Sequence, residues 1–342
     1  VGDIDIAATK EKVQRWFGEI RQGPDIQPNQ PMPVALKETK SLWFEDNFAT
    51  LPELRVTFPS VESYNEDEQA LNVLARLFAG TKNSPLYREV VEEQALAPDV
   101  SAYNSSQEIA GEFVVRIRAK SGTDLDAVKT ALDEAFKDFE EKGVDATDLE
   151  RIKAEQETIL YNNLSTVLGK ANQMASDNEF AGDPAYAIEE AEKLRAVTAE
   201  DVMAVYERYI KDKPSVMTSF VPQGEADLAL EGAEKAEVWI EEVKADVESE
   251  EVSQGEEAEY EKTPSQYDRS EPDFGELPLI DMPDVWAADL SNGAKLYGIE
   301  NDELPLVTFD IVFDAGSWLD PADKVGVANL VAALLNEGTA TK

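Results

Sequence analysis

The sequence of 342 residues contains neither cysteine nor histidine. These two residue types supply the commonest zinc ligands, the cysteine nucleophile and the base of every Ser/His/Asp triad. The chain therefore lacks the most frequent catalytic and metal-binding groups, and it can form no disulfide. It also lacks any apolar run near the roughly 18 residues that cross a bilayer, so no transmembrane span is expected.

Basic residues are scarce, because 31 Lys and Arg stand against 71 Asp and Glu, which gives a net charge of −40. The electrostatic field of so negative a chain repels phosphate backbones and anionic lipid surfaces, so the composition argues against binding to nucleic acid or to membranes. With this many acids, neighbouring carboxylates arise by chance and give little support to a glycosidase-type pair. A calcium site also has little support, since no D-x-[DN]-x-[DN]-G loop occurs.

The first 41 residues read as the end of one domain followed by a linker. Val1–Ala7 has the pattern of a short apolar strand, and Ala8–Ile20 that of a helix with Val13, Trp16 and Phe17 on one face. Four prolines follow between residues 24 and 33, which favours an extended segment. We therefore expect residues 1–25 to be the tail of a preceding domain and residues 26–41 to be a proline-rich linker.

Residues 42–223 carry the signals of a complete domain that mixes strands and helices. Strand-like alternation covers residues 54–58, 113–117 and 215–221, and helical spacing covers residues 70–78, 125–139, 149–168 and 202–209. The expected helix starts are Asn65, Ser84, Thr147 and Thr198. The expected helix ends are Gly80, in the left-handed conformation, and Gly143. This order predicts an α+β fold with a mixed, largely antiparallel sheet and helices packed on one face.

The remaining residues divide into an acidic linker at 224–280 and the start of another domain at 281–342. Glu225–Glu276 holds 19 acids and 4 bases, and Ala233–Val247 is expected to be partly helical. After it we expect a hairpin at Asp289–Ile299 that turns at Asn292-Gly293, a core strand at Val307–Phe313, and a helix at Gly326–Asn336. These pieces are too small to bury a core alone.

The order of these parts resembles the pitrilysin/insulin-degrading family of zinc metallopeptidases, the inverzincins. The resemblance rests on V-G-D-I-D and W-F-G-E-I near the start, on S-P-L-Y-R-E-V-V-E-E-Q-A-L-A at 84–97, and on A-V-T-A-E-D-V at 196–202. It covers nearly the whole chain except the acidic linker. It implies domains like those of mitochondrial processing peptidase and LuxS, arranged as two halves that close like a clamshell around a peptide.

The third domain resembles the family's strand, loop and zinc-binding helix, through D-A-G-S-W-L-D-P and G-V-A-N-L-V-A-A-L-L-N-E-G-T. In active members this helix carries H-x-x-E-H, whose two His hold zinc and whose Glu activates water. The matching positions here are Asn329, Ala332 and Ala333, which can neither hold zinc nor move a proton. This copy is therefore expected to be inactive, and its apolar residues fit an ordinary buried helix.

The family also places an Arg and a Tyr, seven residues apart, in the second domain of its non-catalytic half, where they reach the substrate. The positions that match are Val91 and Pro98, so both groups are missing. Arg88 lies one helical turn before Val91, although an ordinary surface arginine is the better interpretation. The loss is expected if residues 42–223 belong to the zinc-bearing half.

The resemblance implies that this chain is the central fragment of a zinc-dependent peptidase and binds no cofactor itself, the zinc lying in the parent enzyme. It would supply part of the chamber wall, an edge strand for a peptide substrate, and the linker between halves, with the other peptidase domains as partners in cis. The alternatives are a peptidase-like structural subunit without catalysis and an unrelated acidic binding module. By family analogy the location is periplasmic or secreted, and a negative chamber would favour basic or neutral peptides.

Overall fold

The computed structural model describes residues 1–25, 27, 29–238, 263–271, 279 and 282–335. The chain divides into two units, Val1–Met282 and Pro283–Lys342, which are described separately. None of the helices within the described residues combines the length and the apolar character needed to cross a bilayer.

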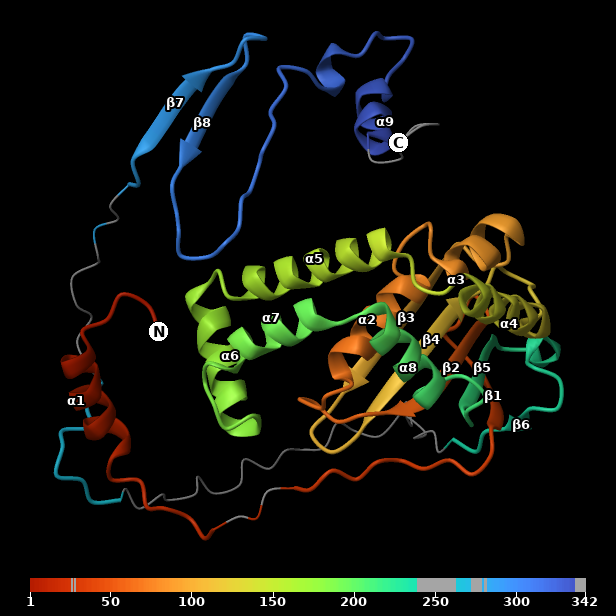
Figure 1. Cartoon of the computed structure of the whole chain (residues 1–342), viewed down its shortest axis with the longest axis horizontal. Helices are drawn as coiled ribbons and strands as arrows, with labels where there is room; N and C mark the ends of the chain where they lie inside the picture. The colour runs from red at the N-terminus through yellow and green to blue at the C-terminus, as the bar shows by residue number, and fades with distance from the viewer. Residues whose placement is uncertain (26, 28, 239–262, 272–278, 280–281, 336–342) are drawn as a thin grey trace, which may run out of the picture. The chain divides into compact units, whose positions relative to one another are not determined.

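The first unit is organised around a sheet of six strands (Figure 1). In spatial order these are β3 (Asp99–Ser106), β4 (Gly111–Arg118), β2 (Glu53–Ser60), β5 (Val216–Pro222), β1 (Lys40–Asp46) and β6 (Glu234–Lys235). The pairs from β3 to β5 are antiparallel, whereas β1 runs parallel to both β5 and β6. The expected α+β fold with a mixed, largely antiparallel sheet is confirmed.

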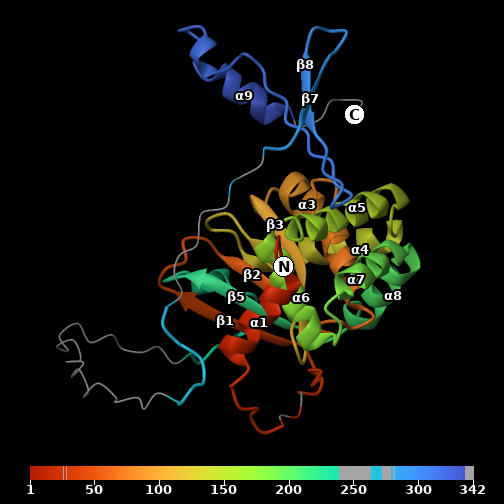
Figure 2. The same cartoon turned by 90° about the vertical axis from the view of Figure 1, so that its left-hand side faces the viewer.

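Helices cover one face of this sheet (Figure 2). The helices of the first unit are α1 (Ile6–Phe17), α2 (Glu68–Ala79), α3 (Pro85–Tyr87), α4 (Leu125–Lys142), α5 (Ala146–Asn163), α6 (Val167–Phe180), α7 (Tyr186–Ala196) and α8 (Ala199–Tyr209). A π-helical turn at Arg88–Glu93 follows α3, and a short 3-10 turn occupies Ala226–Leu228. Helices α2, α4 and α8 contact β2 or β3, so the core lies between them and the sheet.

The core includes the strictly alternating strand β2. Leu54, Val56 and Phe58 of β2 are at most 5% exposed, while the residues between them are partly exposed. Beneath the helices, Phe78 stacks on Phe136 with ring centroids 4.5 Å apart, and Phe139 and Phe58 meet this pair edge-on. Aromatic pairs of this kind add about 0.5–1.5 kcal/mol to the free energy gained by burial.

Some predicted helix signals are confirmed and others are displaced by two residues. Thr198 forms the capping box with Asp201 at the start of α8, as expected. By contrast α5 begins after Asp145, whose carboxylate accepts from two backbone amides, so Thr147 lies inside the helix. Asn65 likewise precedes the true N-cap, Asp67, and its side chain accepts from the Asp67 amide. Asp145 rather than Thr147 caps α5, because its carboxylate reaches the first free backbone amides of the helix.

Two other helix expectations are wrong. The periodicity over 149–168 suggests one helix, yet α5 ends at Asn163 and α6 starts anew at Val167, with Thr166 capping the Gly169 amide. The residue after α2, Gly80, has φ −81° and stays right-handed, whereas Gly143 after α4 has the positive φ of 68° that favours glycine. Apolar spacing alone therefore does not show where a helix is interrupted by a local cap.

The strand expected at Val1–Ala7 is absent, because residues 1–5 are irregular and α1 begins at Ile6. The carboxylate of Asp5 accepts from the Ala8 amide at 2.7 Å, which makes Asp5 the N-cap of α1. The segment 29–38 runs without helix or strand, as the prolines predict.

The first residues of the expected acidic linker belong to the folded domain. Ala229 and Leu230 are buried in the core, and β6 pairs with β1. Residues 233–238 contain no helix, which contradicts the expected partial helix over that part, and residues 239–247 lie outside the described residues. An acidic composition therefore does not by itself mark the domain edge.

The second unit contains the expected hairpin, formed by β7 (Val285–Asp289) and β8 (Lys295–Ile299), with Gly293 at φ 86° in the turn. The expected helix is α9 (Val327–Leu334), preceded by a 3-10 turn at Ser317–Leu319. The core strand expected at Val307–Phe313 is not formed, and its Phe309 and Ile311 are each 78% exposed. Alternation predicts a face that can be buried, but a strand also needs a partner for its backbone hydrogen bonds.

Candidate functional site

The three positions that match the family's zinc motif lie on α9. Asn329 is exposed, and Ala332 and Ala333 offer only methyl groups. The helix has no buried residue, which contradicts the expectation of an ordinary buried helix. No group of three or more acidic side chains within the described residues is placed to hold a metal ion.

The two positions that match the family's substrate-binding pair lie beside the start of β3. Val91 is partly exposed in the π-helical turn, and Pro98 is exposed just before the strand. Arg88 pairs with Glu93 at 3.4 Å across the same turn, with 41% of its side chain exposed. Arg88 is thus a surface arginine engaged within its own turn, in agreement with the ordinary interpretation.

A polar groove of about 430 Å³ follows the edge strand β3. One wall is α2, with Gln69, Asn72 and Arg76, and the other walls come from α5, α6 and α7. Arg76 forms an ion pair with Glu155 of α5, which ties α2 to α5. Asn104 of β3 donates to Asn72 at 3.3 Å and accepts from Ser60 at 2.8 Å. The groove therefore places several amide side chains beside β3. Within the described residues, β3 is the only edge strand on this side of the sheet.

Carboxylates gather at one end of this groove, where α6 and α7 approach α2. Asp177 is fully buried, accepts from Gln173 at 2.9 Å and Tyr64 at 3.3 Å, and leaves Oδ2 without a partner. Burial, and then the charges of Asp177 and Glu68, raise the pKa of Glu190. Burial also raises the pKa of Glu68. Glu190 and Glu68 therefore hold protons more tightly than ordinary carboxylates, because burial disfavours their charged forms.

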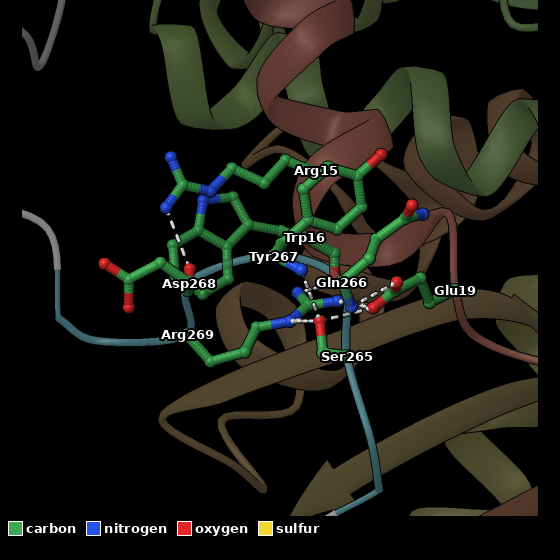
Figure 3. Close-up of polar contacts among 8 residues, drawn as sticks. All are labelled: Arg15, Trp16, Glu19, Ser265, Gln266, Tyr267, Asp268 and Arg269. Carbon is green, nitrogen blue, oxygen red and sulfur yellow. Dashed lines mark hydrogen bonds and ion pairs between the residues drawn. The ribbon is translucent and has the colours of Figure 1, made fainter.

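A second cluster joins α1 to residues 263–271, which lie some 250 positions later in the sequence (Figure 3). The Arg269 guanidinium donates to Glu19 at 2.6 Å and lies 5.5 and 5.7 Å from the ring centroids of Trp16 and Tyr267. Ser265 donates to the same carboxylate at 2.5 Å, and the Gln266 amide does so at 3.0 Å. We call this set of contacts the α1 clamp.

The α1 clamp holds its carboxylate in the charged form. Hydrogen bonds from Ser265, then Gln266 and then Arg269, lower the pKa of Glu19 to about 2. Arg15 adds a bond from Nη2 to the backbone oxygen of Asp268 at 2.8 Å. The clamp fixes the end of the acidic segment to the helix that precedes the folded domain. No motif in the sequence indicates this contact, because a few polar residues far apart give no periodic signal.

Comparison with protein families gives a direct match. Residues 1–156 match the model of the Peptidase M16 inactive domain. This part of the chain is similar to the M16 peptidase family. The resemblance to the pitrilysin-like metallopeptidases seen in the sequence motifs is thereby confirmed, and the matched M16 model is of the inactive kind. No curated protein matches the sequence.

Several solved structures share the fold of this chain. A protease from Helicobacter pylori matches with TM-score 0.56 and 17% identity, over 65% of this chain and 54% of that one. A peptidase M16 inactive domain from Pseudomonas fluorescens gives 0.53 and 15%, over 65% and 52%. The periplasmic protease PqqL from Escherichia coli gives 0.52 and 17%, over 65% and 25%. The chain spans about half the length of the first two structures.

Proposed function

We propose that this chain is the central part of a zinc-dependent M16 metallopeptidase, in which it forms a wall of the substrate chamber and the linker between the two halves. The observation that carries this proposal is the match of residues 1–156 to the M16 inactive domain. The zinc and its ligands would lie in another part of the longer protein, because Asn329, Ala332 and Ala333 lack the His and Glu side chains that would hold zinc and activate water.

Within that enzyme, the groove along β3 is the place where the chain meets an extended peptide. An edge strand leaves backbone donors and acceptors free for another strand, so it binds main chain of any sequence. The amides of Asn72 and Gln69 on the groove wall can bond the side chains of such a peptide without a net charge. Zinc would polarise the scissile carbonyl elsewhere, and this chain would hold the substrate in an extended form.

The α1 clamp supports the second role, that of a linker. It anchors the far end of the acidic segment to α1 through Arg269 and Glu19. Pairing of β6 with β1 anchors the near end. Closure of two halves needs a defined hinge, and anchored linker ends restrict where that hinge can lie.

The test compares this chain with the full-length parent protein on a quenched fluorescent peptide, with zinc and with a chelator. Activity in the parent alone, abolished by the chelator, supports the proposal. A parent without activity would favour a peptidase-like structural subunit. Chelator-sensitive activity in the histidine-free chain would refute the proposal.

We also propose that the parent is exported and prefers basic or neutral peptides. Export is suggested by the description of the similar Escherichia coli PqqL as a periplasmic protease. The substrate preference follows from the net charge of −40, which repels acidic peptides. Cell fractionation tests the first point, and faster cleavage of acidic than of basic peptides of equal length would refute the second.

A further inference from the structure

The sheet face opposite the helices carries an arginine cluster. Alternation along β2 and β4 points Arg55, Arg116 and Arg118 away from the core, toward the face that also carries Glu53. In a chain with 71 acids and 31 bases, three arginines on two adjacent strands form a local concentration of positive charge. This concentration requires a counter-charge.

The register places two of these arginines directly opposite each other. Arg55 pairs with Arg116 across β2 and β4, so their Cβ atoms are about 4.5–5.5 Å apart. Glu53 neutralises the second of them, because it accepts from Arg116 Nε at 2.7 Å and Nη2 at 2.8 Å. The same carboxylate also accepts from Arg118 Nε at 3.3 Å. One glutamate is thus shared by two arginines, while Asp99 lies opposite Arg118 on β3.

Arg55 has no carboxylate partner within the described residues. Its Nη2 donates to the neutral hydroxyl of Tyr103 on β3 at 2.7 Å, and its Nε is buried without any hydrogen-bond partner. The bond to Tyr103 means that the guanidinium extends across β4. Val114 of β4 lies on this face and is fully buried. The guanidinium is therefore held in place by a neutral group, and the Nη donors not used by Tyr103 are left for an anion, because the Nε atom is buried.

An apolar pocket of about 490 Å³ adjoins this arginine on the same face. Its lining includes Val34, Leu36, Thr57, Pro59 and Val216. Thr57 follows Arg55 by two positions on β2, which corresponds to roughly 7 Å along a strand. A ligand that fits both features has a carboxylate close to a large apolar side chain.

We propose that this face binds the C-terminal residue of a peptide, with its α-carboxylate on Arg55 and its large apolar side chain in the adjoining pocket. The proposal rests on the proposed function, since a peptidase chamber contains peptide ends. A planar guanidinium matches a carboxylate in two parallel hydrogen bonds, which favours a carboxylate over a neutral amide. Glu112 at the pocket rim repels a second negative charge, so a single terminal carboxylate is preferred to an acidic peptide.

The test is an NMR titration of this chain with N-acetyl-L-leucine, following the Arg Nε–H signals and the backbone amides of β2 and β4. N-acetyl-L-leucinamide has the same shape without the charge, and we expect it to bind at least about tenfold more weakly. Arg55→Met should reduce the affinity for N-acetyl-L-leucine to that of the amide, and Arg55→Lys should give an intermediate value. Arg88→Met, which removes an exposed arginine from another surface, should change nothing.

Three results would overturn the proposal. The first is equal affinity for N-acetyl-L-leucine and N-acetyl-L-leucinamide. The second is a set of NMR chemical-shift changes that lie away from β2 and β4. The third is tighter binding of N-acetyl-aspartyl-leucinamide than of N-acetyl-L-leucine, which would indicate that the ligand is an acidic side chain within a peptide segment. Urea midpoints of the variants show that each is folded. Because the titration needs neither zinc nor catalysis, its failure leaves the result of the peptidase assay on the parent unaffected.

Discussion

Replacement of Glu53 by Gln tests the electrostatics of the arginine cluster quantitatively. The Glu53 side chain is 14% exposed and bonds Arg116 and Arg118, whose side chains are 40% and 51% exposed. Hydrogen bonds to charged groups contribute about 1.5–3 kcal/mol each, and exposure of the arginines reduces this. Loss of the Glu53 charge also removes the carboxylate that neutralises Arg116, so the opposed Arg55 and Arg116 repel each other. We expect Glu53→Gln to lower the free energy of unfolding by about 1.5–2 kcal/mol.

The assay is urea denaturation at neutral pH, with Glu141→Gln as the matched control. Glu141 pairs with Lys137 at 3.7 Å with both side chains largely exposed, so its loss should cost less than about 0.5 kcal/mol. Salt near 1 M should restore part of the loss in Glu53→Gln, because it screens repulsion among the arginines. The reasoning would be refuted if Glu53→Gln and Glu141→Gln lost equal free energy of unfolding, or if salt did not change the loss in Glu53→Gln.

The same variant has a defined pH dependence. Burial raises the pKa of Glu53, but the hydrogen bonds and charges of Arg116 and Arg118 outweigh it and leave the pKa lowered. A carboxyl with a lowered pKa stabilises the fold above its unfolded pKa, about 4.3, and this contribution is lost as pH falls through the folded pKa. The difference between wild type and Glu53→Gln should therefore shrink on acidification below about pH 4.

Three further predictions concern other parts of the first unit. Arg269→Met should speed proteolysis at residues 263–271, and because the pKa of Glu19 is lowered to about 2, acid should release the α1 clamp only toward that pH. Glu190→Gln should raise the free energy of unfolding at pH 7 but not at about pH 4, because a carboxyl with a raised pKa destabilises the fold when it ionises. Urea midpoints at both pH values measure this. Gly143→Ala should cost roughly 1–3 kcal/mol in urea denaturation, because φ is 68° there, whereas Gly23→Ala should be neutral.

Sequence periodicity predicted the elements that bury a continuous apolar face. The strand at Glu53–Ser60 and the helix at Leu125–Lys142 were both predictable, since their apolar residues repeat at the spacing of the core face. The strand at Asp99–Ser106 was not, because an edge strand with Ser, Asn and Tyr side chains has almost no apolar alternation. Its polar character is what makes the groove along it polar. The polar side chains that leave β3 without a periodic signal are therefore also those that line the groove proposed to bind a peptide.

The candidate sites were even less predictable, because each brings together residues that are remote in the sequence. The groove combines Gln69 of α2 with Asn104 of β3 and Glu190 of α7. The opposition of Arg55 and Arg116 depends on the register of β2 against β4, and a slip by one residue would turn one of them into the core. Register is fixed by the hairpins and by burial across the whole sheet, so no local motif reports it.

The α1 clamp changes how the acidic segment is understood. Composition predicts a solvated linker across 224–280, yet both described ends of it are bound within the first unit. Ala236 donates its backbone amide to Trp43 at 2.8 Å beside β6, and Arg269 is bonded to Glu19 and packed on Trp16. Three of the bonds that hold the far end are made by just two side chains, those of Arg269 and Ser265. In so acidic a segment, a single arginine can therefore decide where the chain attaches, because it has few competitors for the carboxylate that binds it.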